Sequence, residues 1–189
     1  MHTCLLVIDA QESFRRRPYF DAARAATYLA AQNALIKGCE ARAIPIVRIL
    51  HSDGPERADN PFARASGYVR PMDGLAGAEP AATFIKSRHS ALVGTGLDVW
   101  LIRNGVRKLM VSGIRTEQCC ETTTRHASDL GWDVDFVSEA TLTFDMQQPD
   151  GAVLRADDIV QRTATVLMDR FATICTVEQA LARATAAHQ

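Results

Sequence analysis

The sequence predicts an α/β fold in which one mainly parallel, six-stranded sheet is covered by helices on both faces. Six short apolar or β-branched runs alternate with stretches that suit helices, and parallel strands require such helical crossovers. The composition agrees, because 47% of the 189 residues are hydrophobic and 23% are charged, which is ordinary for a globular protein. No repeat or linker interrupts this alternation, so we expect a single domain over residues 1–189.

The chain is expected to begin with a strand, a helix and a second strand. The apolar run at residues 4–8 predicts a buried strand that ends at Asp9. Residues 21–42 are rich in alanine and long enough for a helix. The run 44–50 predicts the second strand, because Pro45 is tolerated near the start of a strand.

The middle of the chain repeats this order of elements. A short third strand is expected at residues 83–85, directly before Lys86. Residues 97–104 carry apolar side chains at spacings of three and four, which predicts a helix that stops at Gly105. The run 108–112 then predicts a fourth strand.

The C-terminal third completes the expected sheet. Residues 116–130 predict a helix closed by Gly131, and residues 134–137 predict the fifth strand. A further helix is expected at residues 156–171, followed by a short last strand at 173–175. Strands separated by helices in this way favour a parallel sheet that is buried on both faces.

One long segment, residues 51–82, does not fit the alternation. It contains four prolines and four glycines and has no sustained periodicity. Loops of this length inside a compact domain are usually functional or mobile. The segment is therefore either a lid or pocket wall, or a plain surface insertion, and the sequence favours neither reading.

Three polar side chains lie at the expected carboxyl ends of strands, where open α/β sheets bind their ligands. Asp9 ends the first strand, Lys86 ends the third, and Cys119 follows the fourth across a short connection. Because these strands would share one sheet edge, we expect the three side chains to converge.

Cys119 has the features of a nucleophile. Thr116 is a suitable N-cap, which would place Cys119 in the first helical turn, where the helix dipole favours a thiolate. A nearby Lys86 ammonium would lower the pKa of the thiol further, and Asp9 could accept its proton. Taken singly, each residue has a structural reading: a buried small hydrophobe, a helix cap and a surface charge. Their combination favours catalysis.

Three motifs, in order along the chain, resemble those of the isochorismatase-like cysteine hydrolases, a family that includes nicotinamidases and N-carbamoylsarcosine amidases. The motifs are Asp9-Ala10-Gln11-Glu12-Ser13-Phe14, Lys86-Ser87-Arg88-His89-Ser90-Ala91, and the stretch from Val111 through Gly113, Thr116 and Cys119 to Thr124. The segments Gly131-Trp132-Asp133-Val134 and Ser138-Glu139-Ala140 resemble the family strand after the catalytic helix. The resemblance extends from the first expected strand to the last.

The resemblance implies a three-layer, Rossmann-like α/β/α sandwich with an Asp9–Lys86–Cys119 triad and a covalent intermediate on the cysteine. It also implies a cis peptide bond between Ile114 and Arg115. The backbone N–H groups of Arg115 and Cys119 would then form the oxyanion hole. Family members commonly form dimers or tetramers, so a homo-oligomer is expected.

The resemblance also suggests residues around the substrate. Phe14, His51, His89 and Arg115 are candidates for substrate binding, although a solvated Arg115 is the more ordinary reading. Cys120 replaces a usual apolar residue and is read as packing, since it would point about 100° around the helix from Cys119. Nicotinamidases bind a metal through an Asp-x-His pair and a further histidine. That spacing is missing here, because the next histidine after His51 is His89, so no metal is expected.

The composition argues against several other classes of protein. The net charge is −1, and the longest basic run, Arg15-Arg16-Arg17, is too short to predict nucleic-acid binding. No glycine-rich nucleotide loop follows the first strand, so no cofactor is expected. An odd number of cysteines, five, without a C-x-x-C spacing and the lack of a long apolar leader favour a cytoplasmic protein without a membrane partner.

The function favoured by the sequence is hydrolysis of a C–N bond in a small amide, carbamoyl or imide substrate. Isochorismatase-type cleavage of an enol ether is an alternative, but the family branch with that chemistry does not strictly need the cysteine that this chain keeps. A catalytically silent binding or assembly protein on the same fold is a second alternative. A redox sensor using Cys119 and Cys120 ranks last, because a disulfide between neighbours is strained.

Overall fold

The fold, described for residues 2–186 by a computed structural model, is a three-layer α/β/α sandwich, as predicted. Its central sheet has the strand order β3-β2-β1-β4-β5-β8, and every neighbouring pair is parallel. The strands are β1 (His2–Ile8), β2 (Ile46–His51), β3 (Ala82–Lys86), β4 (Val106–Ile114), β5 (Asp133–Leu142) and β8 (Thr173–Cys175). The helices are α1 (Ala22–Glu40), α2 (Leu97–Arg103), α3 (Glu121–Asp129), α4 (Ala156–Leu167) and α5 (Val177–Ala186).

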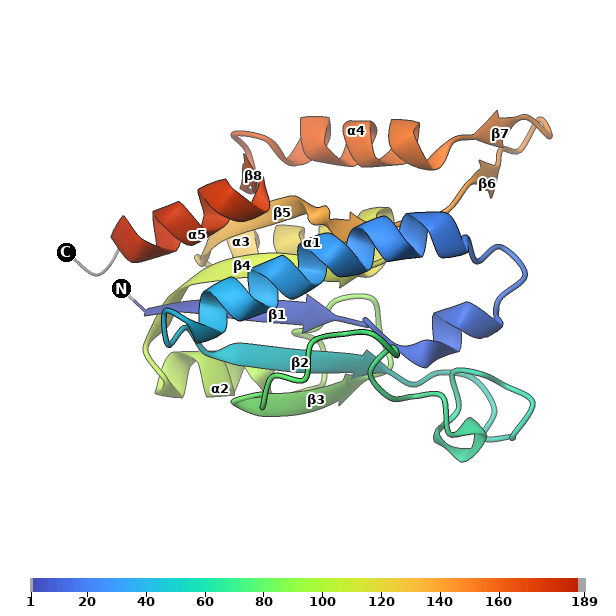
Figure 1. The fold of residues 1–189 in the computed structure, drawn as a ribbon, viewed down its shortest axis with the longest axis horizontal. Coiled ribbons are helices and arrows are strands. Elements are labelled where there is room, and N and C mark those ends of the chain that lie inside the picture. Colours follow the sequence, from blue (N-terminus) through green and yellow to red (C-terminus); the bar gives the residue numbers. More distant parts are fainter. Residues whose placement is uncertain (1, 187–189) are drawn as a thin grey trace.

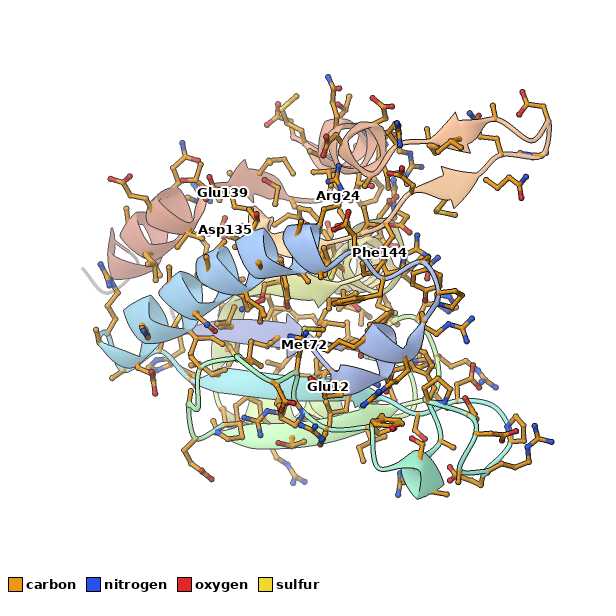
Figure 2. The ribbon with its side chains drawn as sticks, turned by 45° about the vertical axis from the view of Figure 1, so that its right-hand side comes forward. Glu12, Arg24, Met72, Asp135, Glu139 and Phe144 are labelled. Carbon is orange, nitrogen blue, oxygen red and sulfur yellow. The ribbon has the colours of Figure 1, made fainter. Side chains whose placement is uncertain are left out.

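The two faces of the sheet have separate apolar cores. Helices α1 and α5 cover one face, where Met72 and Phe144 also pack, and α2 and α3 cover the other (Figures 1 and 2). The central strand β1 contributes side chains to both cores. Leu5 and Val7 belong to the first core, and Leu6 and Ile8 belong to the second. Burying each such side chain contributes about 1.5–3 kcal/mol, which explains why this strand reads as a continuous apolar run.

The observed element boundaries differ from the predicted ones for physical reasons. Strand β2 starts at Ile46, because Pro45 has no N–H to donate, although its carbonyl still accepts a hydrogen bond from the Leu5 N–H at 2.9 Å. Helix α1 begins after Asp21, whose side chain accepts hydrogen bonds from two backbone N–H groups of the first turn. Helix α4 ends at Leu167, earlier than predicted, just before Asp169 takes a left-handed conformation.

Two features were not predicted from the sequence. Helix α5 follows the last strand and packs small alanine side chains, Ala180 and Ala184, against the α1 side of the sheet. A hairpin of β6 (Met146–Gln147) and β7 (Val153–Leu154) lies between β5 and α4 and projects from the body of the fold (Figure 1). None of the described helices has both the length and the apolar character needed to cross a bilayer.

The close approach of β4 to the end of β1 depends on Gly113. This residue has φ 128°, and a Cβ atom placed on it would lie 1.9 Å from the Ile8 carbonyl oxygen. Because that oxygen belongs to the central strand, it cannot move aside cheaply. Gly113 therefore allows the strand that leads to Cys119 to lie against the strand that leads to Asp9.

We expect Gly113→Ala to lower the free energy of unfolding by more than about 2 kcal/mol, since it combines backbone strain with a steric clash. Gly67→Ala is the matched control, because Gly67 also has a positive φ, 74°, but a Cβ there would meet no atom within 4 Å. Urea denaturation of both variants measures the difference. Equal losses would mean that the close approach is unimportant.

Candidate active site

The carboxyl ends of three strands bring Asp9, Lys86 and Cys119 into contact, as the sequence predicts. Asp9 directly follows β1, and Lys86 is the last residue of β3. The Lys86 ammonium lies 2.7 Å from the Asp9 carboxylate and 3.2 Å from the Cys119 sulfur. All three side chains are buried, with exposed fractions of 0%, 2% and 7%. The cluster is therefore a preformed arrangement of acid, cation and thiol.

The turn that carries Cys119 differs from the predicted α-helical start. Arg115 is the N-cap residue, and Thr116–Cys120 form a single π-helical turn that continues into α3. The Thr116 hydroxyl does not cap this turn but donates to the Thr141 hydroxyl at 2.9 Å. Its buried position against β5 explains why the predicted N-cap is wrong. The peptide bond between Ile114 and Arg115 is cis, as expected.

The surroundings of Cys119 favour its neutral thiol, contrary to the sequence-based expectation. Burial and the Asp9 carboxylate raise the pKa of Cys119 to about 12, and the Lys86 ammonium opposes them only in part. Burial also lowers the pKa of Lys86, but Asp9 and Cys119 outweigh it and raise that pKa above its ordinary value. The resting cluster is therefore an ion pair beside a neutral thiol, in which Asp9 is placed to take the thiol proton.

A small cavity of about 370 Å³ opens over the sulfur. Its lining residues are Asp9, Phe14, Arg17, Tyr19, His51, Asp53, Gly54, Pro55, Asn60, Phe62, His89, Gln118 and Cys119. Phe14, His51 and His89 were predicted to bind substrate, and all three line the cavity. Arg17 and Tyr19 were missed, although they follow the Asp9 motif in a loop beyond the end of a strand, which is a usual place for ligand contacts.

The side chain of Arg115 is not among the residues that line this cavity, and its assignment to substrate binding stays a prediction. Its guanidinium lies 3.0 Å from the Glu117 carboxylate and donates a hydrogen bond to the Thr143 hydroxyl. It also lies 5.3 Å from the centre of the Tyr19 ring. Its charge is therefore paired with Glu117 and faces the ring of Tyr19, a residue of the cavity wall.

The long segment after β2 forms one wall of the cavity. Asn60 closes its first turn by donating to the carbonyl groups of Asp53 and Pro55 at 2.7 and 3.1 Å. Further along, the carbonyls of Tyr68 and Arg70 accept backbone hydrogen bonds from residues 13 and 12, beyond the end of β1. In Figure 1 the first part of this segment lies beyond the arrowheads of β1 and β2, and its last part runs back to the start of β3. It is therefore an anchored pocket wall.

The Lys86 ammonium has a third partner, which was not predicted. The Nδ1 atom of His51, the last residue of β2, lies 2.9 Å from it. From the sequence, His51 is expected to lie in the pocket but not in this cluster. Strand β2 pairs with both β1 and β3, so its end lies between the strand ends that carry Asp9 and Lys86. This position of His51 at a neighbouring strand end is the signal from which the contact could have been predicted.

A metal ion does not fit among these side chains. Ligand atoms of Asp9, His51 and Cys119 lie within 4.8 Å of one another. However, the Lys86 ammonium contacts all three residues, so a positive charge already lies among them. Its repulsion would oppose a divalent cation at this position. The expectation that no metal takes part stays a prediction.

Comparisons with family models and with curated proteins point to the same family. A family model described as an isochorismatase domain matches residues 3–179. The isochorismatase family protein YrdC of Bacillus subtilis (strain 168) is 32% identical over 111 residues, which cover 59% of this chain and 56% of that protein. Nicotinamidase 3 of Arabidopsis thaliana is 36% identical over 69 residues, covering 36% and 35% of the two chains. The matched segments thus span about half or less of these curated relatives.

Solved structures extend the similarity over nearly the whole chain. The crystal structure of an isochorismatase from Pseudomonas putida KT2440 superposes with a TM-score of 0.82 at 27% identity. The alignment covers 94% of this chain and 89% of that one. The strand order and the helices on both faces are therefore those of a known fold.

Proposed function

Because the chain belongs to the isochorismatase family, we propose that it is a cysteine hydrolase that cleaves the C–N bond of a small amide, carbamoyl or imide substrate. The observation that carries this proposal is the contact of one buried ammonium, that of Lys86, with both the Asp9 carboxylate and the Cys119 sulfur. This arrangement supplies a nucleophile, a base for its proton and a cation that holds them together.

In the first half of the reaction, the Cys119 sulfur attacks the carbonyl carbon of the substrate. The thiol proton passes to Asp9 as the S–C bond forms, because a thiol with a pKa of about 12 is not ionised beforehand. Asp9 then gives this proton to the leaving nitrogen, and the C–N bond breaks. The products are ammonia or an amine and an acyl group bound to the sulfur.

In the second half, water hydrolyses the thioester. Asp9 accepts a proton from the attacking water and returns it to the sulfur when the S–C bond breaks, which restores the neutral thiol. The negative oxygen formed in both halves would be stabilised by the backbone N–H groups of Arg115 and Cys119, in the turn that carries the nucleophile. Lys86 keeps the carboxylate beside the sulfur throughout.

The cavity supports a small substrate. Its volume of about 370 Å³ is near the lower end of the range for ligand sites. Aromatic side chains, including Phe14 and Phe62, line its walls, and their rings pack edge to face with centres 5.2 Å apart. The similarity to a plant nicotinamidase, an enzyme named for an amide, supports C–N hydrolysis over enol-ether cleavage.

The proposal is tested by an ammonia-release screen over small amides, ureas and imides, with the Cys119→Ser variant as the blank. We expect release from at least one substrate class by the native protein and none above background by the variant. Equal release by both proteins would identify a contaminant. No release from any substrate would contradict C–N hydrolysis and favour a binding protein on the same fold.

A further inference from the structure

We propose that His51 is a positioning residue, whose Nδ1 atom holds the Lys86 ammonium between Asp9 and Cys119. This inference rests on the proposed function for the chemistry of the triad. It adds a fourth member to the cluster and gives His51 a role other than substrate binding.

The Lys86 ammonium needs a partner for each of its donors. Lys86 has three N–H donors. Its nitrogen is hydrogen-bonded to His51 at 2.9 Å and to Cys119 at 3.2 Å, and it forms an ion pair with the Asp9 carboxylate at 2.7 Å. The side chain is buried, so a donor left without a partner would carry a desolvation penalty of about 1–3 kcal/mol. A lysine stem is also flexible, and three acceptors in different directions define one position for its end.

His51 is itself held in place. The Gln11 carboxamide donates to the His51 carbonyl at 3.0 Å and accepts from the His51 N–H at 2.7 Å, so one fully buried side chain pairs with both backbone groups. The imidazole packs edge-on against the Phe62 ring, with centres 5.9 Å apart. Backbone and ring are therefore both fixed, as a positioning role requires.

The contacts also define the state of the imidazole. Because Nδ1 accepts a hydrogen bond from an ammonium, the ring is neutral and its proton is on Nε2. The Nε2 atom lies 3.8 Å from the Asp53 carboxylate, which favours this tautomer. Burial and the neighbouring Lys86 lower the pKa of His51, which agrees with a neutral ring at physiological pH.

The test compares two substitutions that differ in one property. In His51→Asn the side-chain oxygen can take the place of Nδ1 as acceptor, whereas His51→Leu has a similar size to asparagine but no acceptor. The first measurement needs no substrate: the rate at which iodoacetamide alkylates Cys119, located by mass spectrometry. If the ammonium is displaced, the Asp9 charge acts on the thiol with less compensation, its pKa rises and alkylation slows.

We expect alkylation at least about fivefold slower in His51→Leu and within about twofold of the native rate in His51→Asn. With a substrate found by the screen, kcat should follow the same order while KM changes little. Equal losses in both variants, or a raised KM in His51→Leu with unchanged alkylation, would overturn the proposal. If His51→Leu does not fold, His51→Phe, which keeps a ring against Phe62, replaces it.

The alkylation readout also separates the two proposals. It depends on the positions of Lys86, Asp9 and the sulfur, and not on which bond the protein hydrolyses. An unsuccessful substrate screen together with the expected order of alkylation rates would contradict C–N hydrolysis and leave the role of His51 supported.

Discussion

Replacing Cys119 by alanine is expected to reduce hydrolysis by at least about 10⁴-fold, because removal of a nucleophile leaves only substrate binding and the oxyanion contacts. Cys119→Ser should lose nearly as much activity, since a serine hydroxyl is far less acidic than a thiol and the Asp9–Lys86 pair is not arranged to activate it. The side chain is small and at the edge of a cavity, so the fold should be retained.

The measurement is ammonia release on the best substrate of the screen, together with the melting temperature of each variant. Cys120→Ala is the matched control, because Cys120 is fully buried in the α3-side core and has no place in the chemistry. It should lower stability by about 1 kcal/mol and leave kcat within about threefold of the native value. Native rates in either Cys119 variant would remove the nucleophile assignment.

Replacing Asp9 by asparagine is expected to change two rates in opposite directions. Hydrolysis should fall by about 10²–10⁴-fold, because no group would then accept the thiol proton or deliver it to the leaving nitrogen. Alkylation of Cys119 near neutral pH should become faster. The Asp9 charge is one cause of the raised thiol pKa, and without it the Lys86 ammonium at 3.2 Å favours the thiolate.

The size of the second effect follows from the thiolate fraction. A hundredfold larger fraction would raise the alkylation rate about tenfold, since the nucleophilicity of a thiolate falls as its pKa falls. Iodoacetamide kinetics across the alkaline range measure this directly: the native rate should keep rising with pH, and the variant should level off at lower pH. If Asp9→Asn slows both alkylation and hydrolysis, the carboxylate does not hold the thiol in its protonated state.

In the Asp9→Asn variant, ionisation of the Cys119 thiol would also limit the loss in free energy of unfolding. A buried ammonium left without its counter-charge costs about 3–5 kcal/mol, and in Asp9→Asn the thiolate can replace the carboxylate. The double variant Asp9→Asn with Cys119→Ala has no such group. We expect it to be less stable in urea than the sum of the two single variants predicts, which a double-mutant cycle measures.

The sequence by itself determined the succession of strands along the chain and the three residues that meet in the Asp9–Lys86–Cys119 cluster. Each central strand is a short apolar run, and Asp9 and Lys86 come at strand ends that a parallel sheet must bring to one edge. Such features are local, so periodicity and motif order are sufficient to find them. Helix α5 was not predicted because its two fully buried residues, Ala180 and Ala184, are small and give little apolar contrast along the chain, although Val177 and Leu181 also pack against this core.

Only the tertiary structure decided how the cluster is charged and what surrounds it. The protonated state of Cys119 depends on burial and on the Asp9 carboxylate, which is remote in sequence, and it is the reverse of what the start of a helix suggests. Two further contacts likewise depend on distances of a few ångströms: the ion pair of Arg115 with Glu117 and the contact of His51 with Lys86. Electrostatic and hydrogen-bond energies change steeply over such distances, and spacing along the chain does not specify them.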